Sequence, residues 1–257
     1  MPVSVVQTKG ETQNNCSGCS ITLNSLTASG NTLVVAIGEN DGGGPTACGD
    51  GLDILSVTDT RGDAFTKAVG VCNVAIGVAD EFSAIWYATS VLSGSSGITV
   101  NFNAIGNTVG IFAYEVNGLG TAPVVQDSGT GTGNNSDSAS TASTSFSGTV
   151  IFSVGAVAHP FAGISGGASY TLRTQFNPLT TEDSLTVTSP TTFPMTMGGL
   201  HSWADVGVIM IGPTPSVAAF TESGSKRQYR RSSVIGNKIK SLFAIISKKN
   251  GIFQEGE

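Results

Sequence analysis

The sequence predicts an all-β fold, an antiparallel sandwich of two sheets with a short basic helical tail at the C-terminus. Of the 257 residues, 34 are glycine and only 12% are charged, which is about half the usual fraction of charged residues. Few lysines and glutamates leave few good helix formers. Short apolar segments are separated about every 10 to 15 positions by clusters of Gly, Asn, Asp and Ser, as in a sandwich. The pattern changes at Pro213 and Pro215.

About thirteen short strands are expected before residue 213, and no helix before residue 230. Segment 149–158 is apolar on both faces, which predicts a central strand that a second sheet covers. Tract 128–136, rich in Gly, Ser, Thr and Asn, is expected as a loop that leads into a polar edge strand. The expected strands are 3–8, 20–26, 32–38, 54–58, 64–69, 83–88, 98–103, 109–116, 138–145, 149–158, 169–175, 184–189 and 205–211.

These strands are expected to form one domain, residues 1–217, followed by a tail, residues 218–257. The segments before tract 128–136 are too few to close a stable sandwich alone, so the tract is not interpreted as a linker. No apolar run approaches the roughly 18 to 20 residues of a membrane-spanning helix. Residues 1–10 have neither the basic start nor the apolar segment of a targeting signal.

The charges divide the chain into an acidic body and a basic tail. Residues 1–224 carry four basic and sixteen acidic side chains, a net charge of −12, whereas residues 225–257 have a net charge of +6. An acidic body repels phosphates, so nucleic acid is excluded as its partner. In the tail, the apolar residues recur at helical spacing, which predicts a basic amphipathic helix: Ile235, Ile239, Leu242 and Ile246. Such a helix lies on an anionic membrane surface or docks on a partner protein, and an unpacked tail is the alternative.

All four cysteines, Cys16, Cys19, Cys48 and Cys72, lie in the first third of the chain. One Cys-x-x-Cys pair followed by two single cysteines fits disulfides or zinc, but the second closely spaced pair of a zinc ribbon is missing. Disulfides are therefore favoured over a metal. Of the three possible connectivities, we favour a local Cys16–Cys19 link with a Cys48–Cys72 bridge.

A glycine-rich loop after residue 38 gathers the acidic residues Glu39, Asp41, Asp50 and Asp53. Calcium prefers several oxygen ligands on flexible backbone, which such a loop supplies. The regular spacing of the best-known calcium loops is missing, so a solvated loop is favoured over a calcium site. Calcium is the one cofactor that the sequence suggests.

Three aromatic residues, Trp203, Tyr87 and Tyr170, are the candidate ligand-binding residues, because a flat ring stacks on the apolar face of a sugar. Trp203 lies in the loop-like segment 199–203 and is the best candidate for exposure. Tyr87 directly follows Trp86, so one of the two is expected to face the core and the other to face outward. Core packing is the alternative role of either tryptophan.

No catalytic residue is predicted. Glycoside hydrolysis needs two facing carboxylates, and Glu115 has no partner on its own expected strand, although Asp127 or Glu81 is conceivable across strands. His159 and His201 are expected at turns or on the surface. The Gly-x-Ser-x-Gly motif of a nucleophilic serine is not present.

Several segments together resemble the jelly-roll (concanavalin-like) β-sandwich module of bacterial, archaeal and phage surface proteins. They are SGNTLVVA at 29–36, ILSVTDTRGDAF at 54–65, AIWYA at 84–88, ITVNF at 98–102 and YEVNGL at 114–119. The resemblance spans residues 3–212 and rests on structural motifs, so it transfers no catalytic residue. It implies a jelly-roll fold and an extracellular or virion location.

Three functions follow as hypotheses. The first is a non-catalytic extracellular or cell-surface module for adhesion or glycan binding, whose partner is a glycan or a neighbouring subunit. The second is a structural subunit of a filament or virion, assembled when segment 3–8 adds a strand to the next copy. The third is a β-sandwich glycoside hydrolase that uses Glu115.

Overall fold

The protein is all-β and antiparallel, as predicted, in two sheets of six strands each. The computed structural model describes residues 2–40, 54–73, 81–120, 123–145, 152–160, 163–187, 189 and 191–212. All of them belong to one compact unit, Met1–Ser216. None of these residues forms a helix that is long and apolar enough to cross a membrane. The expected tail helix lies outside the described residues, and the domain boundary at 217 stays a prediction.

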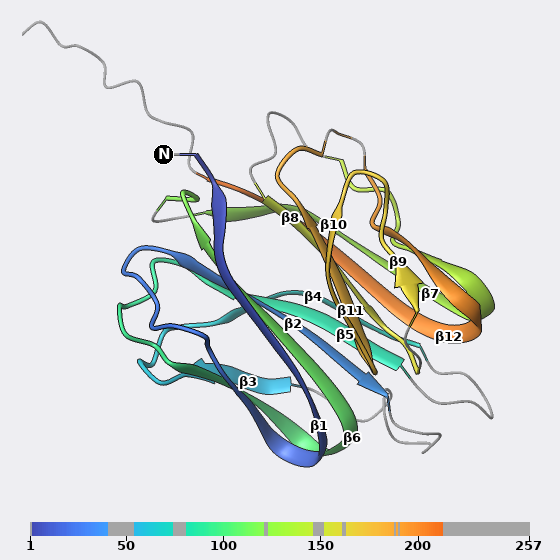
Figure 1. Ribbon diagram of the computed structural model, residues 1–257, viewed down its shortest axis with the longest axis horizontal. Helices are drawn as coiled ribbons and strands as arrows, with labels where there is room; N and C mark the ends of the chain where they lie inside the picture. Colours follow the sequence, from blue (N-terminus) through green and yellow to red (C-terminus); the bar gives the residue numbers. More distant parts are fainter. Residues whose placement is uncertain are drawn as a thin grey trace, which may run out of the picture. The chain divides into compact units, whose positions relative to one another are not determined.

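The first sheet has the order β1-β6-β2-β5-β4, with β3 paired to β6, and the second has the order β10-β11-β8-β12-β7, with β9 paired to β12 (Figure 1). The strands of the first sheet are β1 (Ser4–Thr22), β2 (Thr32–Asn40), β3 (Ile54–Asp59), β4 (Thr66–Asn73), β5 (Glu81–Ala88) and β6 (Gly97–Asn117). Those of the second are β7 (Val124–Ser140), β8 (Phe152–Ala158), β9 (Ile164–Ser165), β10 (Thr171–Phe176), β11 (Leu179–Ser184) and β12 (Pro194–Ile211).

Several strand predictions are corrected: β12 begins at Pro194 rather than at residue 205, and the short strand β9 was not expected. Tract 128–136 is not a loop but the middle of β7. The strand expected at 184–189 is wrong, because the strand of this region is β11 and ends at Ser184. Segments 3–8 and 20–26 overlap the two ends of one continuous strand, β1, which ends at Thr22, and segments 98–103 and 109–116 are likewise joined in β6.

Each sheet is covered on one face by its own longest pair of strands. β1 pairs with β6 from Ser4 opposite Asn117 to Thr22 opposite Gly97, and this pair bends (Figure 1). The bend brings Ile21 of β1 and Ile98 of β6 into the same apolar cluster as Leu33 of β2. β7 and β12 bend together in the same way in the second sheet (Figure 1).

The two sheets are copies of one topology. β1 to β6, which we call the first half, and β7 to β12, the second half, have the same strand order and the same side pairing of the third strand. Register defines equivalent positions: Thr32 opposite Val116 in the first half corresponds to Phe152 opposite Met210 in the second. Equivalent residues of β1 and β7 are 120 positions apart, and Asn15 and Asn135 both have a φ of 53°.

The other faces of the two sheets pack against each other. The cluster between them contains equivalent residues from both halves, such as Val34 with Val154 and Ala36 with Ala156. Tyr114 of the first sheet meets Phe152 of the second with ring centroids 5.8 Å apart. β8 is therefore buried on both faces along its whole length, as its apolar sequence predicted.

Glycines explain why tract 128–136 is a strand. Gly129, Gly131 and Gly133 alternate along β7, so they share one face of it. A Cβ on Gly131 would lie 2.1 Å from the carbonyl oxygen of Ser140, and one on Gly133 would lie 2.4 Å from the indole of Trp203. The missing side chains let the bent end of β7 and Trp203 approach the strand, so glycine here marks close packing rather than a flexible loop.

We predict that Gly131→Ala lowers the free energy of unfolding by about 1–3 kcal/mol, because the new methyl group meets a backbone carbonyl that cannot rotate away. Gly18→Ala in β1 is the matched control, since its Cβ would meet only the side-chain oxygen of Asn101 at 3.5 Å. Urea unfolding followed by circular dichroism measures both variants. Equal stability of the two would contradict this account of β7.

Candidate functional site

A pocket of about 290 Å³ opens on the second half, between the turn that precedes β10 and the segment that precedes β12. Its lining is uncharged and carries several hydroxyl groups. The lining residues are Ala168, Ser169, Tyr170, Thr186, Val187, Thr191, Thr192 and Pro194. The volume is at the lower limit of roughly 300–1,000 Å³ for small-molecule pockets, which suits one small ring rather than a long chain.

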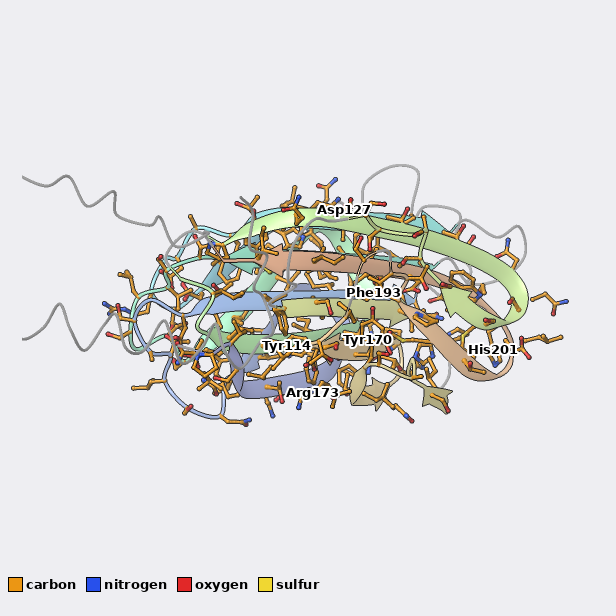
Figure 2. All side chains as sticks on the ribbon, turned by 90° about the horizontal axis from the view of Figure 1, so that it is seen from above. Tyr114, Asp127, Tyr170, Arg173, Phe193 and His201 are labelled. Carbon is orange, nitrogen blue, oxygen red and sulfur yellow. A yellow bond between two sulfur atoms is a disulfide. The ribbon has the colours of Figure 1, made fainter. Side chains whose placement is uncertain are left out.

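Tyr170 joins the two sides of the pocket. Its hydroxyl group donates to the carbonyl oxygen of Thr192 at 2.9 Å and lies 3.0 Å from the hydroxyl oxygen of Thr191. Its ring packs on Phe193 with centroids 5.4 Å apart, and the two lie side by side in Figure 2. Burial, aided by the nearby carboxyl groups of Glu182 and Asp205, raises the pKa of Tyr170 to about 12. The phenol therefore stays a neutral hydrogen-bond donor at ordinary pH.

Two fully buried carboxyl groups lie on the same face of the second sheet. Glu182 stands on β11 and Asp205 on β12, with β8 between them, and both have 0% exposure. Oε2 of Glu182 accepts a hydrogen bond from the backbone N–H of Gly167 at 2.7 Å. Oε1 of Glu182 has no hydrogen-bond partner, and the carboxyl group of Asp205 has no side-chain partner, only the backbone N–H of the next residue, Val206. Such groups are rare in folded proteins and call for an explanation.

The first half shows what the fold alone needs at these positions. The register places Trp86 at the position of Glu182 and Ile111 at that of Asp205. Both of these residues belong to or pack on the continuous apolar cluster of the first half. In the second half the corresponding space holds two separate clusters of described residues, one around Trp203 and one around Phe193. The two acids are therefore an addition of the second half and not a requirement of the fold.

Glycines in the second half make room for the ring between the acids. Gly155 and Gly207 lie side by side where the first half has Val35 and Ala113. A Cβ on Gly207 would lie 2.0 Å from the ring of Phe193, and one on Gly155 would lie 2.9 Å from it. Phe193 thus fills the space that these side chains would occupy.

Burial raises the pKa of both acids. It raises the pKa of Glu182 to about 7, with a smaller contribution from the charge of Asp183, against the opposing hydrogen bond from Gly167. It raises the pKa of Asp205 well above its usual range, with help from the charge of Glu182. Among the described residues, no group of three or more His, Cys, Asp or Glu side chains could hold a metal ion.

The three predicted ligand-binding aromatics have different positions. Tyr170 lines the pocket. Trp203 is not exposed, because only 6% of its surface is accessible and it packs within the cluster of Met195 and Met197 in the continuous strand β12. Tyr87 packs against the cluster between the sheets, and Trp86 packs against the cluster on the opposite face, so neither is turned fully outward.

The predicted Cys16–Cys19 disulfide is present, with the two Cα atoms 5.4 Å apart. Cys48 lies outside the described residues, so the Cys48–Cys72 bridge stays a prediction. Of the acidic residues considered for calcium, Glu39 is buried in β2. The other three, Asp41, Asp50 and Asp53, lie outside the described residues, so the calcium site also stays a prediction.

Glu115 has a local structural role. Its carboxylate accepts hydrogen bonds from the Ala28 N–H at 2.8 Å, from Asn31 at 2.6 Å and from Gln7 at 2.6 Å. These bonds fasten the segment that leads into β2. Glu81 lies at the other end of β2, opposite Asn40, and Asp127 lies in the second sheet. The structure therefore brings neither conceivable carboxylate partner to Glu115.

Two further expectations are corrected. His159 is buried rather than on the surface, with 1% exposure, and its Nε2 lies 2.9 Å from the hydroxyl oxygen of Thr180. Segment 3–8 is not a free strand, because it lies in β1 and pairs with β6 of the same chain. His201 lies where β12 bends (Figure 2).

Glu182 and Asp205 were not predicted as site residues from the sequence. Glu182 lies in the polar run TTEDS, which does not read as a buried strand. Asp205 was placed at the polar start of a strand, whereas it lies in the interior of β12. A charged residue between the apolar neighbours Ala204 and Val206 was the one available signal.

Comparisons with protein-family models, with curated proteins and with solved structures find no match to this chain.

We predict that the free energy of unfolding falls as the pH rises from about 4 to about 8. Because each buried acid has a higher pKa in the folded than in the unfolded state, the folded protein holds more protons and loses stability as they dissociate. For Glu182 the loss extends from its usual pKa of 4.5 to about 7. For Asp205 it begins above 3.8.

Asp205→Asn removes one of these titrations, so its stability should fall less with pH than that of the wild type, by about 1.4 kcal/mol for each pKa unit removed. Urea unfolding at a series of pH values measures the slope. The exposed Asp137→Asn is the control and should keep the wild-type slope. A wild-type slope in Asp205→Asn would show that Asp205 ionises as easily in the folded as in the unfolded chain.

Proposed function

We propose that the protein is a non-catalytic module that binds one uncharged sugar unit of a glycan in the pocket around Tyr170. The observation that carries the proposal is the lining of this pocket, an aromatic ring surrounded by hydroxyl groups with no charged side chain. Aromatic carbon and hydroxyl groups match the two kinds of surface on a sugar ring, its C–H faces and its own hydroxyls.

Charge supports an uncharged ligand. Residues 1–224 have a net charge of −12, which disfavours the approach of phosphorylated, sulfated or carboxylated glycans. Tyr170 and the threonines of the pocket donate and accept hydrogen bonds without carrying charge. Recognition therefore rests on hydrogen bonds and on contact with the ring.

The architecture and the disulfide support a surface module of the jelly-roll type. If the two bent strands of each half are counted as two segments each, a half contains eight segments in two layers, the number of strands in a jelly roll. We therefore propose one jelly roll per half. The Cys16–Cys19 disulfide is compatible with an extracellular location.

We predict that Ser169→Trp abolishes glycan binding without unfolding the protein. Ser169 is exposed and lines the pocket, so a large side chain blocks the opening and strains nothing buried. The wild type is first screened on an array of neutral glycans, and the affinity for the best ligand is then measured by calorimetry. Ser165→Trp is the matched control, because Ser165 is an exposed serine of the neighbouring strand β9 and does not line the pocket.

Binding that survives in Ser169→Trp would place the site elsewhere. The absence of any ligand on the array would contradict glycan binding itself. Circular dichroism and the unfolding midpoint of both tryptophan variants confirm that the fold is retained.

A further inference from the structure

The turn of residues 166–170 forms one wall of the pocket, and Glu182 holds it from beneath. Gly167 closes the turn by accepting a hydrogen bond from the Tyr170 N–H at 3.0 Å. The N–H of Gly167 in turn donates to Oε2 of Glu182 at 2.7 Å. The next residues of the turn, Ala168 to Tyr170, line the pocket. One buried carboxyl group therefore contacts the backbone that carries part of the proposed binding surface.

The first half holds the equivalent turn differently. Its register makes Phe65 the equivalent of Tyr170 and Asp63 the equivalent of Ala168. The carboxylate of Asp63 accepts the backbone N–H of Leu92 at 3.0 Å, which ties this turn to the segment that leads toward β6. Ala168 has no side-chain acceptor. The second half thus has its pocket where the first half has this tie, and its turn depends on Glu182.

Close contact leaves no room for another anchor at the base of the turn. A Cβ on Gly166 would lie 2.9 Å from Oε2 of Glu182, and one on Gly167 would lie 2.9 Å from the ring of Tyr170 and 3.0 Å from Pro194. The turn can rest on Glu182 only because both positions are glycine. A movement of the turn away from the sheet would uncover the carboxyl group and open the pocket wall at the same time.

We propose that Glu182 is a positioning residue of the Tyr170 pocket, which keeps the wall of residues 166–170 closed while its carboxyl group is neutral and releases the wall when it ionises. The inference rests on the proposed function, because it assigns a pH-dependent affinity to the same site. In the closed turn the carboxyl group is fully buried, whereas in an open turn water solvates it. Ionisation is therefore less costly in the open turn.

Burial disfavours the charged form of Glu182 and the hydrogen bond from Gly167 favours it, and burial has the larger effect. Asp205 of β12, His159 at the end of β8 and Tyr170 of the turn are the titratable groups on its face of the sheet, and Asp183 is paired with Arg173 on the opposite face. Burial raises the pKa of Glu182 to about 7, so the closed turn is favoured below neutral pH. The closed turn becomes less stable as the pH rises through the pKa of Glu182 in the closed state.

Hydrogen exchange of the whole protein, followed by mass spectrometry, tests the proposal. After correction for the intrinsic exchange rate, the peptide that covers residues 166–171 in the wild type should lose protection by about tenfold between pH 5.5 and pH 8.5. Tenfold corresponds to one unit of pKa difference between the closed and the open turn. Glu182→Gln keeps the acceptor for Gly167 but cannot ionise, so its turn should stay protected at both pH values.

Two controls separate positioning from a general loss of stability. A merely structural role of Glu182 would change the protection of the core peptide 109–116 of β6 as much as that of the turn. Glu81→Gln is the matched variant, because Glu81 is an equally buried glutamate that is bonded to Asn40, away from the pocket. It should leave the pH response of the turn unchanged. If Glu182→Gln does not fold, the wild-type profile alone decides, since protection of the turn that is constant across this pH range overturns the proposal.

Ligand binding then separates this proposal from the proposed function. The affinity of the wild type for the best neutral glycan should be weaker at pH 8.5 than at pH 5.5, and that of Glu182→Gln should be the same at both. A turn that opens with pH in a protein that binds no glycan would support the role of Glu182 and refute the proposed function. Glycan binding blocked by Ser169→Trp, with equal pH dependence in the wild type and in Glu182→Gln, would overturn the positioning role alone.

Discussion

The antiparallel pairing of two long bent strands in each half is the interaction on which the rest of the structure depends. β2 is buried along nearly all of its length and β8 along all of it, so each sheet needs a cover on both faces. The facing half supplies one cover. The other comes from the bent ends of β1 with β6 and of β7 with β12. Without these bends, one apolar face of each sheet would remain in water.

Comparison of the two halves shows which residues replace part of the apolar layer under the bent strands in the second half. In the first half, Trp86 and Ile111 complete the layer under the bent ends. In the second half, Glu182 and Asp205 stand at the same positions and contribute a desolvation cost instead of apolar contact. Residues that reduce stability in this way are expected where a protein carries a functional site. The comparison is internal to the chain, so the fold, the strand order and the depth of burial are the same on both sides.

Periodicity predicted the strands whose apolar residues are visible in the sequence, such as β2, β5 and β8. It missed β7 and β11. In β7 the close approach of neighbouring segments requires glycine, and glycine reads as a loop. In β11 all six residues are buried, and all but Leu179 are polar or charged, so the segment resembles a polar surface in the sequence. Trp203 was expected in a loop because its neighbours His201 and Ser202 are polar, although the strand continues through them.

The site was predictable only in part, for a related reason. Tyr170 was selected only because it is aromatic, and it lines the pocket. The repeat of the two halves, which makes Glu182 stand out, was not visible in the sequence, because equivalent residues such as Trp86 and Glu182 have chemically unrelated side chains. What the halves share is backbone geometry: Asn15 and Asn135 have the same positive φ. Sequence patterns depend on the types of side chain, whereas the two halves share only their strand order, their register and the bends of their long strands.

The difference between the two halves reduces to the way in which one turn is held. In the first half, the carboxylate of Asp63 accepts the N–H of Leu92, a hydrogen bond at the surface. In the second half, Ala168 cannot make this bond, and Gly167 binds a buried carboxyl group below. The second half therefore holds the turn through Glu182 below it, instead of through a hydrogen bond to the neighbouring segment, as in the first half. Because Glu182 holds the turn from below, the pocket beside it stays open to solvent. The same contact makes the pocket wall sensitive to the charge of Glu182.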